Sequence, residues 1–203
     1  MRYLFLLLFL TTNTLAFSKN SISNDIRKLK KMKNKHNKII TNLVYKTSKK
    51  YELNPKIILA ILKLESNFEQ SGMNKYKCDG KKECGDFSIA QINYKTWKKS
   101  ANLNLDKLKS NNAYAIDKMG WILSDIRKRH PKDKLWFLRY HSRNYLLRIR
   151  YLKILERYFA KISYELDYDA IDQLHQLAVM KHGWRRVLAI YRKTPSIPPL
   201  IQY

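Results

Sequence analysis

Apolar residues recur at helical spacing along most of this chain, and this pattern constrains its fold more than any other feature. One run of apolar positions, each three or four residues after the last, comprises Ala113, Ile116, Met119, Leu123 and Ile126. The 203 residues include only 5 glycines and 5 prolines, too few for the many turns of an all-β protein. The sequence therefore predicts an all-α fold with one main domain.

Two segments flank the central domain, which we place at residues 51–164. Residues 17–50 are predicted to form a basic N-terminal helix, because apolar positions recur at helical spacing around the basic run Arg27–Lys38. Residues 165–203 are predicted to form a C-terminal extension with a weaker amphipathic pattern, interrupted at Gly183. We expect this extension either to pack on the domain and end in a loose tail, or to dock a partner.

Residues 1–16 have the features of an export signal. Arg2 supplies a positive charge, Leu4–Leu10 is an uninterrupted apolar run, and Thr14-Leu15-Ala16 places small residues where signal peptidase reads them. We therefore expect cleavage after Ala16 and a periplasmic or secreted protein. The alternative is an uncleaved N-terminal anchor, which also places the rest of the chain outside the cytoplasm.

The two cysteines, Cys78 and Cys84, lie close together in a polar stretch. An oxidising compartment would let them pair, so we expect a disulfide. Metal binding is not expected, because no second Cys or His pair completes a zinc set. No GxGxxG, P-loop or HExxH motif is present, so no cofactor is predicted.

The chain carries 41 Lys and Arg against 16 Asp and Glu, a formal net charge of +25. Such a charge attracts polyanions without specificity, including the carboxylates and phosphates of cell-wall polymers. The basic run Arg27–Lys38 has no aromatic residue for base stacking and no known reading motif, so no specific nucleic-acid partner is predicted. The run is interpreted as a solvated helix face, with a role at a membrane surface as the alternative.

Glu65 is placed unusually for a surface carboxylate. The pair Asn54-Pro55 predicts the start of a helix that continues to about Ser66. Glu65 follows Leu62 by three residues and therefore lies on the apolar face of this helix. Burial there would raise its pKa, and a carboxyl that stays protonated near neutral pH suits general-acid cleavage of a glycoside. The alternative is a helix-end glutamate that turns to water or binds a lysine.

Three short motifs follow one another along the chain: Glu65-Ser66-Asn67-Phe68, Gly85–Asn93 and Tyr140-His141-Ser142. Their order resembles that of motifs in the soluble-type lytic transglycosylases, which are relatives of goose-type lysozyme. The first is similar to the Glu-Ser motif of that family, and the second to its Gly-x-x-Gln-Ile segment. Tyr140-His141-Ser142 is similar to the third, aromatic motif, and Tyr151 falls where the family often has another tyrosine. The resemblance covers residues 51–159, roughly half of the chain.

The resemblance implies a lysozyme-like helical domain at residues 51–164 that cuts peptidoglycan. Enzymes of this family cleave the β-1,4 bond between N-acetylmuramic acid and N-acetylglucosamine and leave a 1,6-anhydro-muramoyl product. Glu65 would be the catalytic acid and base, and Tyr140 would orient it or the substrate acetamido group. The implied substrate-binding residues are Ser66, Gln91, Asn93, Tyr140 and His141. Small exported members often serve a secretion or conjugation machine, so we expect a monomer that works beside one.

Two alternatives use the same scaffold. A hydrolytic muramidase needs a second carboxylate, for which Asp86 is the best candidate, although we favour a turn-capping role for that side chain. A noncatalytic wall-binding or assembly protein is the other alternative, because Ser88 stands where the family usually has glycine. A left-handed backbone at Ser88 would cost about 1 kcal/mol. Tryptophans at helical spacing usually belong to the core, and Trp97, just after the second motif, is the one to test for stacking on a sugar.

Overall fold

The computed structural model describes residues 17–30, 33–70 and 85–193. Helix accounts for 72% of these residues, which confirms the predicted all-α class. The two strands found in the described part are β1 (Asp86–Phe87) and β2 (Ile92–Asn93), which pair antiparallel. The helices are α1 (Lys19–Leu29), α2 (Asn34–Tyr51), α3 (Pro55–Ser66), α4 (Tyr94–Trp97), α5 (Leu105–Ser110), α6 (Asn112–Arg129), the 3-10 helix η1 (Trp136–Tyr140), α7 (Tyr145–Lys161), α8 (Tyr168–His182) and α9 (Trp184–Lys193).

Several predictions concern segments that the structure does not describe. The export signal at residues 1–16, the cysteines Cys78 and Cys84, and the last ten residues of the predicted C-terminal extension all lie outside the described residues. Within residues 17–30, 33–70 and 85–193, no helix combines the length and the apolar character that crossing a membrane requires.

Helix α3 lies at the centre of the fold and begins where the sequence predicts. The Asn54 side chain accepts a hydrogen bond from the Lys56 N–H at 2.9 Å, and Pro55 occupies the first turn, where no N–H partner is needed. Every residue from Ile57 to Leu62 is buried. A helix that is apolar around most of its circumference must be covered by its neighbours, and α1, α2 and α7 all pack against α3.

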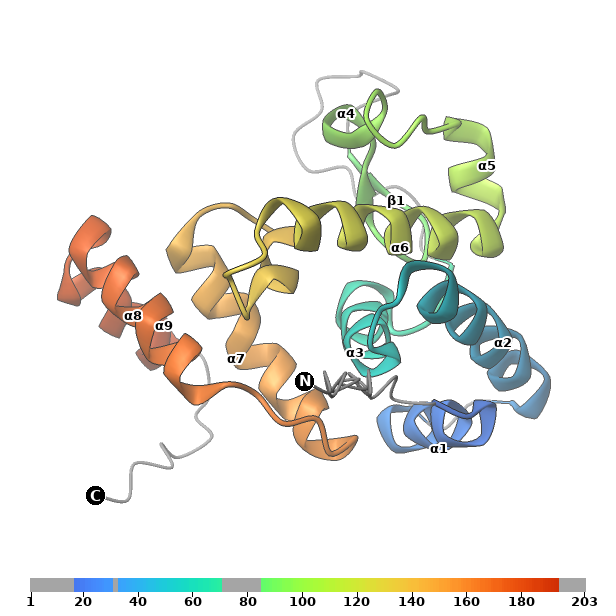
Figure 1. Cartoon of the computed structure of the whole chain (residues 1–203), viewed down its shortest axis with the longest axis horizontal. Coiled ribbons are helices and arrows are strands. Elements are labelled where there is room, and N and C mark those ends of the chain that lie inside the picture. Colours follow the sequence, from blue (N-terminus) through green and yellow to red (C-terminus); the bar gives the residue numbers. More distant parts are fainter. Residues whose placement is uncertain (1–16, 31–32, 71–84, 194–203) are drawn as a thin grey trace, which may run out of the picture.

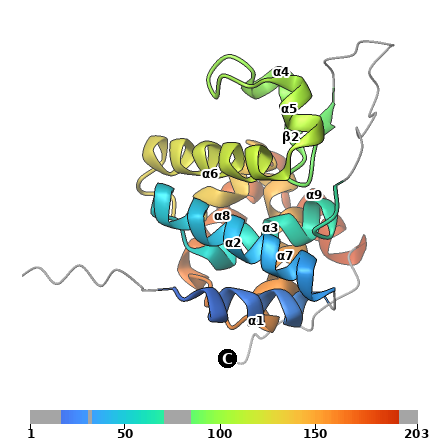
Figure 2. The ribbon, with the colours of Figure 1, turned by 90° about the vertical axis from the view of Figure 1, so that its right-hand side faces the viewer.

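Helix α6 separates two parts of the molecule (Figures 1 and 2). The segment carrying β1, β2, α4 and α5 lies on one side of α6, and α1, α2 and α3 lie on the other. The end of α6 comes just before Pro131, as the sequence predicts. Helix α7 follows η1 and packs against both α3 and η1, which closes the core.

The segment predicted as one basic helix is in fact two helices, α1 and α2. The residue after α1, Lys30, has an extended backbone with φ −155° and ψ 128°, which ends the first helix. Both helices bury their apolar faces in the main core while most of their lysines and arginines stay exposed; the core side chains include Ile22, Ile26, Leu29, Ile40 and Val44. Residues 17–50 are therefore part of the folded domain rather than an appendage.

The C-terminal helices α8 and α9 pack on α7. Their buried side chains include Ile171, Leu174, Ala178 and Val187. The chain breaks between them at Gly183, where φ is +78°, as the sequence predicts. Packing on the domain is thus observed for residues 168–193, and the docking of a partner stays a prediction.

Gly120 allows α6 to approach α2 closely. A Cβ atom at this position would lie 2.3 Å from Thr47 Cγ2 and 2.6 Å from Tyr51 Cδ2. Neither neighbour can easily move: Thr47 is β-branched and buried, and the Tyr51 hydroxyl donates to Asp117 at 3.2 Å. The contact between the two helices therefore depends on the absence of a side chain at residue 120.

Gly120→Ala is expected to destabilise the protein by roughly 1–3 kcal/mol, because overpacking outweighs the gain in helix propensity. The free energy of unfolding from urea titration is the measurement. Ala113→Gly, at an exposed position of the same helix, is the matched control and reports propensity alone. A Gly120→Ala protein more stable than the wild type would contradict this account of the contact.

Candidate active site

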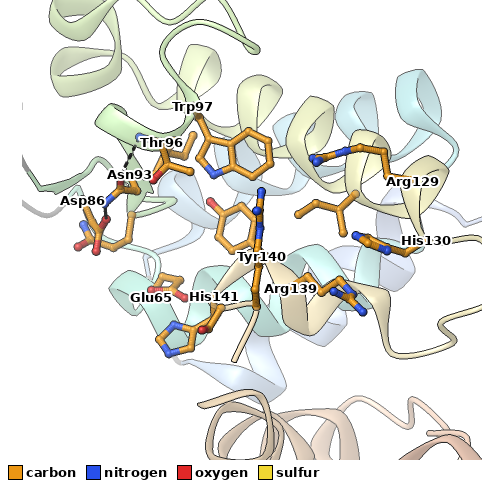
Figure 3. A pocket seen from close by; sticks show the side chains of 15 residues that line it. Glu65, Asp86, Asn93, Thr96, Trp97, Arg129, His130, Arg139, Tyr140 and His141 are labelled. Atoms are coloured by element: carbon orange, nitrogen blue, oxygen red, sulfur yellow. Dashed lines mark hydrogen bonds between the residues drawn. The ribbon is translucent and has the colours of Figure 1, made fainter. Parts of the chain in front are cut away.

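A cavity of about 370 Å³ opens between the segments on either side of α6. Its walls come from the end of α3, the β1–β2 hairpin, α4, the end of α6, and η1 with the turn after it. Figure 3 shows that side chains from all of these elements converge on it. The second and third sequence motifs therefore meet Glu65, from the first motif, at one place.

Glu65 occupies the last turn of α3, and the end of this helix is fixed. Asn67 adopts a left-handed backbone with φ +55°, and the Phe68 N–H returns to the Leu62 carbonyl at 3.4 Å. Asparagine tolerates this conformation better than most residues, and the buried Phe68 ring anchors the turn. The Glu65 side chain therefore has a fixed origin at the cavity wall.

The Glu65 carboxyl has one strong hydrogen-bond partner among the described residues. The Tyr151 hydroxyl on α7 donates to Glu65 Oε1 at 2.6 Å. Tyr151 is only 4% exposed, and the His141 ring stacks on it with centroids 4.4 Å apart and planes 5° from parallel. No lysine or arginine of the described part forms an ion pair with Glu65, and the tyrosine hydroxyl takes the place that the alternative gave to a lysine.

Burial raises the pKa of Glu65 from 4.5 to about 7. Desolvation of the carboxylate is the main cause, and the nearby negative charge of Asp86 adds to it. The hydrogen bond from Tyr151 opposes both effects, because it stabilises the charged form. Near neutral pH the group is therefore divided between the acid and its carboxylate, as the sequence analysis expected.

Tyr140 contributes a wall of the cavity, but its hydroxyl is already engaged. It donates to the Ala90 carbonyl at 2.6 Å and so ties η1 to the turn of the β hairpin. The hydroxyl that contacts Glu65 belongs to Tyr151 instead. Tyr151 is the additional tyrosine of the family resemblance. Nothing in the sequence around Tyr151 indicated that its hydroxyl would bond to Glu65.

Asp86 and Asn93 face each other across the hairpin and form its last pair. Asn93 Nδ2 donates to Asp86 Oδ1 at 2.9 Å, and Asn93 Oδ1 caps α4 by accepting from the Thr96 N–H. Asp86 was expected to cap a turn, and it is bonded to this capping residue instead. Both side chains line the cavity, so Asp86 is a second carboxylate beside Glu65.

The hairpin turn uses left-handed backbone at two residues that are not glycine. Ser88 has φ +73° and Gln91 has φ +45°. The Ser88 hydroxyl accepts from the Ala90 N–H at 3.2 Å, and Gln91 Nε2 donates to the Ser88 carbonyl at 2.8 Å. Ser88 therefore has the left-handed backbone that costs free energy in a residue other than glycine. The hydrogen bonds inside the turn offset this cost. Gln91 still reaches the cavity wall.

Five of the six predicted catalytic and substrate-binding residues line the cavity: Glu65, Gln91, Asn93, Tyr140 and His141. Ser66 is the exception, because its hydroxyl donates to the Leu62 carbonyl of its own helix at 3.1 Å. Trp97 lines the cavity as expected. The sequence analysis did not single out the arginines Arg129, Arg139 and Arg143, which also line it, because arginines in so basic a chain carry no local signal.

No set of three His, Cys, Asp or Glu side chains suited to a metal ion occurs within the described ranges. The titratable groups of the cavity are instead two carboxyls together with arginine, histidine and tyrosine side chains. Chemically, such an arrangement can donate a proton, accept it back and hold a polar chain.

Glu65→Gln is expected to gain stability relative to the wild type as the pH rises. A folded-state pKa above the unfolded value gives stability that is complete below about pH 4 and is lost as the pH passes about 7. The variant has no carboxyl to ionise at this position. Its free energy of unfolding relative to the wild type should therefore rise by on the order of 3 kcal/mol between about pH 4 and about pH 8. Urea unfolding across this range is the measurement, with the exposed Glu165→Gln as control; a constant difference would contradict the burial of the Glu65 charge.

Tyr151→Phe is expected to raise the pKa of Glu65 above about 7, because it removes the hydrogen bond with which a described residue favours the carboxylate. Carbon-13 NMR titration of the Glu65 side-chain carboxyl measures this directly. Tyr168→Phe, at an exposed tyrosine on α8, is the matched control and should leave the titration unchanged. An unchanged or lowered midpoint in Tyr151→Phe would show that the hydroxyl does not act on the carboxyl.

Comparison with models of known protein families gives no match, and neither a search of curated proteins nor a search of solved structures gives one. A function for the chain must therefore be inferred from its own residues and from the geometry of this cavity.

Proposed function

We propose that the protein is an exported lytic transglycosylase that cleaves peptidoglycan. The observation that carries the proposal is the Glu65 carboxyl, which is buried at the end of α3, has a pKa of about 7 and opens onto the cavity. A carboxyl in this state can give a proton to a leaving oxygen at neutral pH and take one back. The convergence of three motifs on this carboxyl supports the same family that the sequence resembles.

In the proposed reaction, Glu65 protonates the glycosidic oxygen between N-acetylmuramic acid and N-acetylglucosamine. The bond from that oxygen to C1 of the muramoyl residue then breaks, and the N-acetylglucosamine side leaves with the proton. The Glu65 carboxylate accepts the proton of the muramoyl C6 hydroxyl, whose oxygen attacks C1 and closes a 1,6-anhydro ring. Glu65 ends protonated, and no water is consumed.

The other cavity residues position this chemistry. Tyr151 holds one carboxyl oxygen of Glu65, and His141 packs against the Tyr151 ring. Gln91 and Asn93 line the cavity, and their side-chain amides bond within the hairpin, to Ser88 and Asp86, so both help to fix this wall of the cavity. The half-buried Trp97 offers an aromatic face for a sugar ring. A secretion or conjugation machine stays the proposed setting for the enzyme.

Asp86 supports a second candidate, a hydrolytic muramidase. It lines the same cavity as Glu65, and its negative charge acts on the Glu65 carboxyl. In a hydrolase, a second carboxylate activates water or forms a covalent intermediate. We favour the transglycosylase because Asp86 Oδ1 already accepts from Asn93, a bond that holds the hairpin strands together.

The deciding experiment is mass spectrometry of soluble products after mature protein acts on purified peptidoglycan. Muropeptides that end in 1,6-anhydro-muramic acid are expected, and Glu65→Gln should lower their rate of release by roughly 100-fold or more while the protein stays folded. Reducing-end products would instead establish the hydrolase. Wild-type rates in Glu65→Gln would overturn the catalytic role of Glu65. No products from folded wild type would overturn the proposed activity and favour a binding or assembly role.

A further inference from the structure

The cavity has an acidic side and a basic side. In Figure 3, Glu65 and Asp86 lie toward one side, Arg129, His130 and Arg139 lie toward the other, and Trp97 and Tyr140 lie between them. The proposed chemistry uses the acidic side and gives the basic side no role. The basic side is therefore the largest unexplained feature of the site.

The charge of Arg139 is only partly neutralised by the protein. Its Nε donates to Asp133 Oδ2 at 2.8 Å, but Arg148 Nη2 donates to the same oxygen at 2.9 Å. Arg148 is 2% exposed and depends on this carboxylate, because a buried guanidinium without a partner is costly. Two guanidinium groups thus share one carboxylate, which leaves one positive charge beside the cavity without a counter-charge among the residues that the structure describes.

Two further arginines add to this charge. Arg143 lines the cavity, is exposed, and forms no ion pair with any residue that the structure describes. Arg129 pairs with Asp125 in an exposed contact that water screens, and its Cζ atom lies 5.7 Å from the Trp97 ring centroid. A ligand in the cavity would therefore meet guanidinium groups that can still bind an anion.

The pKa of His130 is consistent with a positive electrostatic potential from these arginines. Its pKa is lowered, first by desolvation and then by the charge of Arg139, and Arg129 and Arg148 act in the same direction. The carboxylate of Asp133 opposes them without cancelling them. An anion bound beside these arginines would offset their effect and raise the pKa of His130.

We propose that the arginines that line the cavity, Arg129, Arg139 and Arg143, bind a carboxylate of the same glycan chain whose glycosidic oxygen reaches Glu65. This inference rests on the proposed function and adds a substrate requirement to it: the glycan must carry a negative charge. Guanidinium groups bind carboxylates with two parallel hydrogen bonds, which orients a ligand as well as holding it. In peptidoglycan the carboxylate has two sources: the lactyl group of a muramoyl residue without a peptide, or the stem peptide, which is joined to the lactyl carboxyl as an amide and carries carboxylates of its own.

The test is calorimetric binding to the full mature chain carrying Glu65→Gln, so that ligands are not cleaved. Three tetrasaccharides serve as probes: neutral chitotetraose, a peptide-free glycan with lactyl carboxylates, and the same glycan with its stem peptides. We expect the carboxylate-bearing glycans to bind at least about tenfold more tightly than chitotetraose at low salt. Tight binding of the peptide-free glycan identifies the lactyl carboxylate as the ligand, and tight binding of the peptide form alone identifies the stem peptide.

Adding Arg143→Gln should cut the preference for the charged glycans by about tenfold, and adding Arg192→Gln, at an exposed arginine on α9 outside the cavity, should not. Binding of a charged glycan should also raise the NMR titration midpoint of His130, because its carboxylate would offset the charges of Arg139 and Arg129; a merely structural role of these arginines would leave the midpoint unchanged. Equal binding of neutral and charged glycans would overturn the carboxylate site and leave the proposed function standing. Failure of all three glycans to bind would overturn both.

Discussion

The burial of α3 is the constraint on which the rest of the structure depends. Six consecutive apolar residues, Ile57 to Leu62, are covered by helices on several sides, and the helix then ends with a carboxyl group at the wall of a cavity. The same packing that stabilises the core removes water from Glu65 and raises its pKa to about 7. Fold stability and proton chemistry are therefore linked through one helix, and the charged form of Glu65 is held at a cost to the folded state.

Tyr151 shows how the surrounding helices moderate this cost. Its hydroxyl is the one described partner of the carboxyl, and it acts against desolvation by favouring the carboxylate. Because the tyrosine is buried in the contact between α3 and α7, its position is set by core packing rather than by a flexible loop. A group that must both donate and accept a proton benefits from such a partner, since neither of its states is then strongly excluded.

Local signals were enough to predict α3, its cap at Asn54, the apolar position of Glu65 and the break at Gly183. Features that depend on contacts between distant segments were not predictable in this way. Tyr151 lies 86 positions from Glu65, and only the packing of α7 on α3 makes them partners. The β hairpin was not predicted, because its turn has a left-handed backbone at Ser88 and Gln91, and this conformation normally favours glycine. The division of the basic segment at Lys30 likewise has no glycine or proline to mark it.

The packing of α1 and α2 sets a lower limit on how much of the chain can stand alone. All residues that line the cavity fall between Glu65 and Arg143, yet the hydrophobic core extends from Ile22 to Val187. The smallest folding unit is therefore roughly twice as long as the smallest chemical unit. Substitutions throughout the outer helices can change how much folded protein a cell maintains without altering the cavity of each folded molecule.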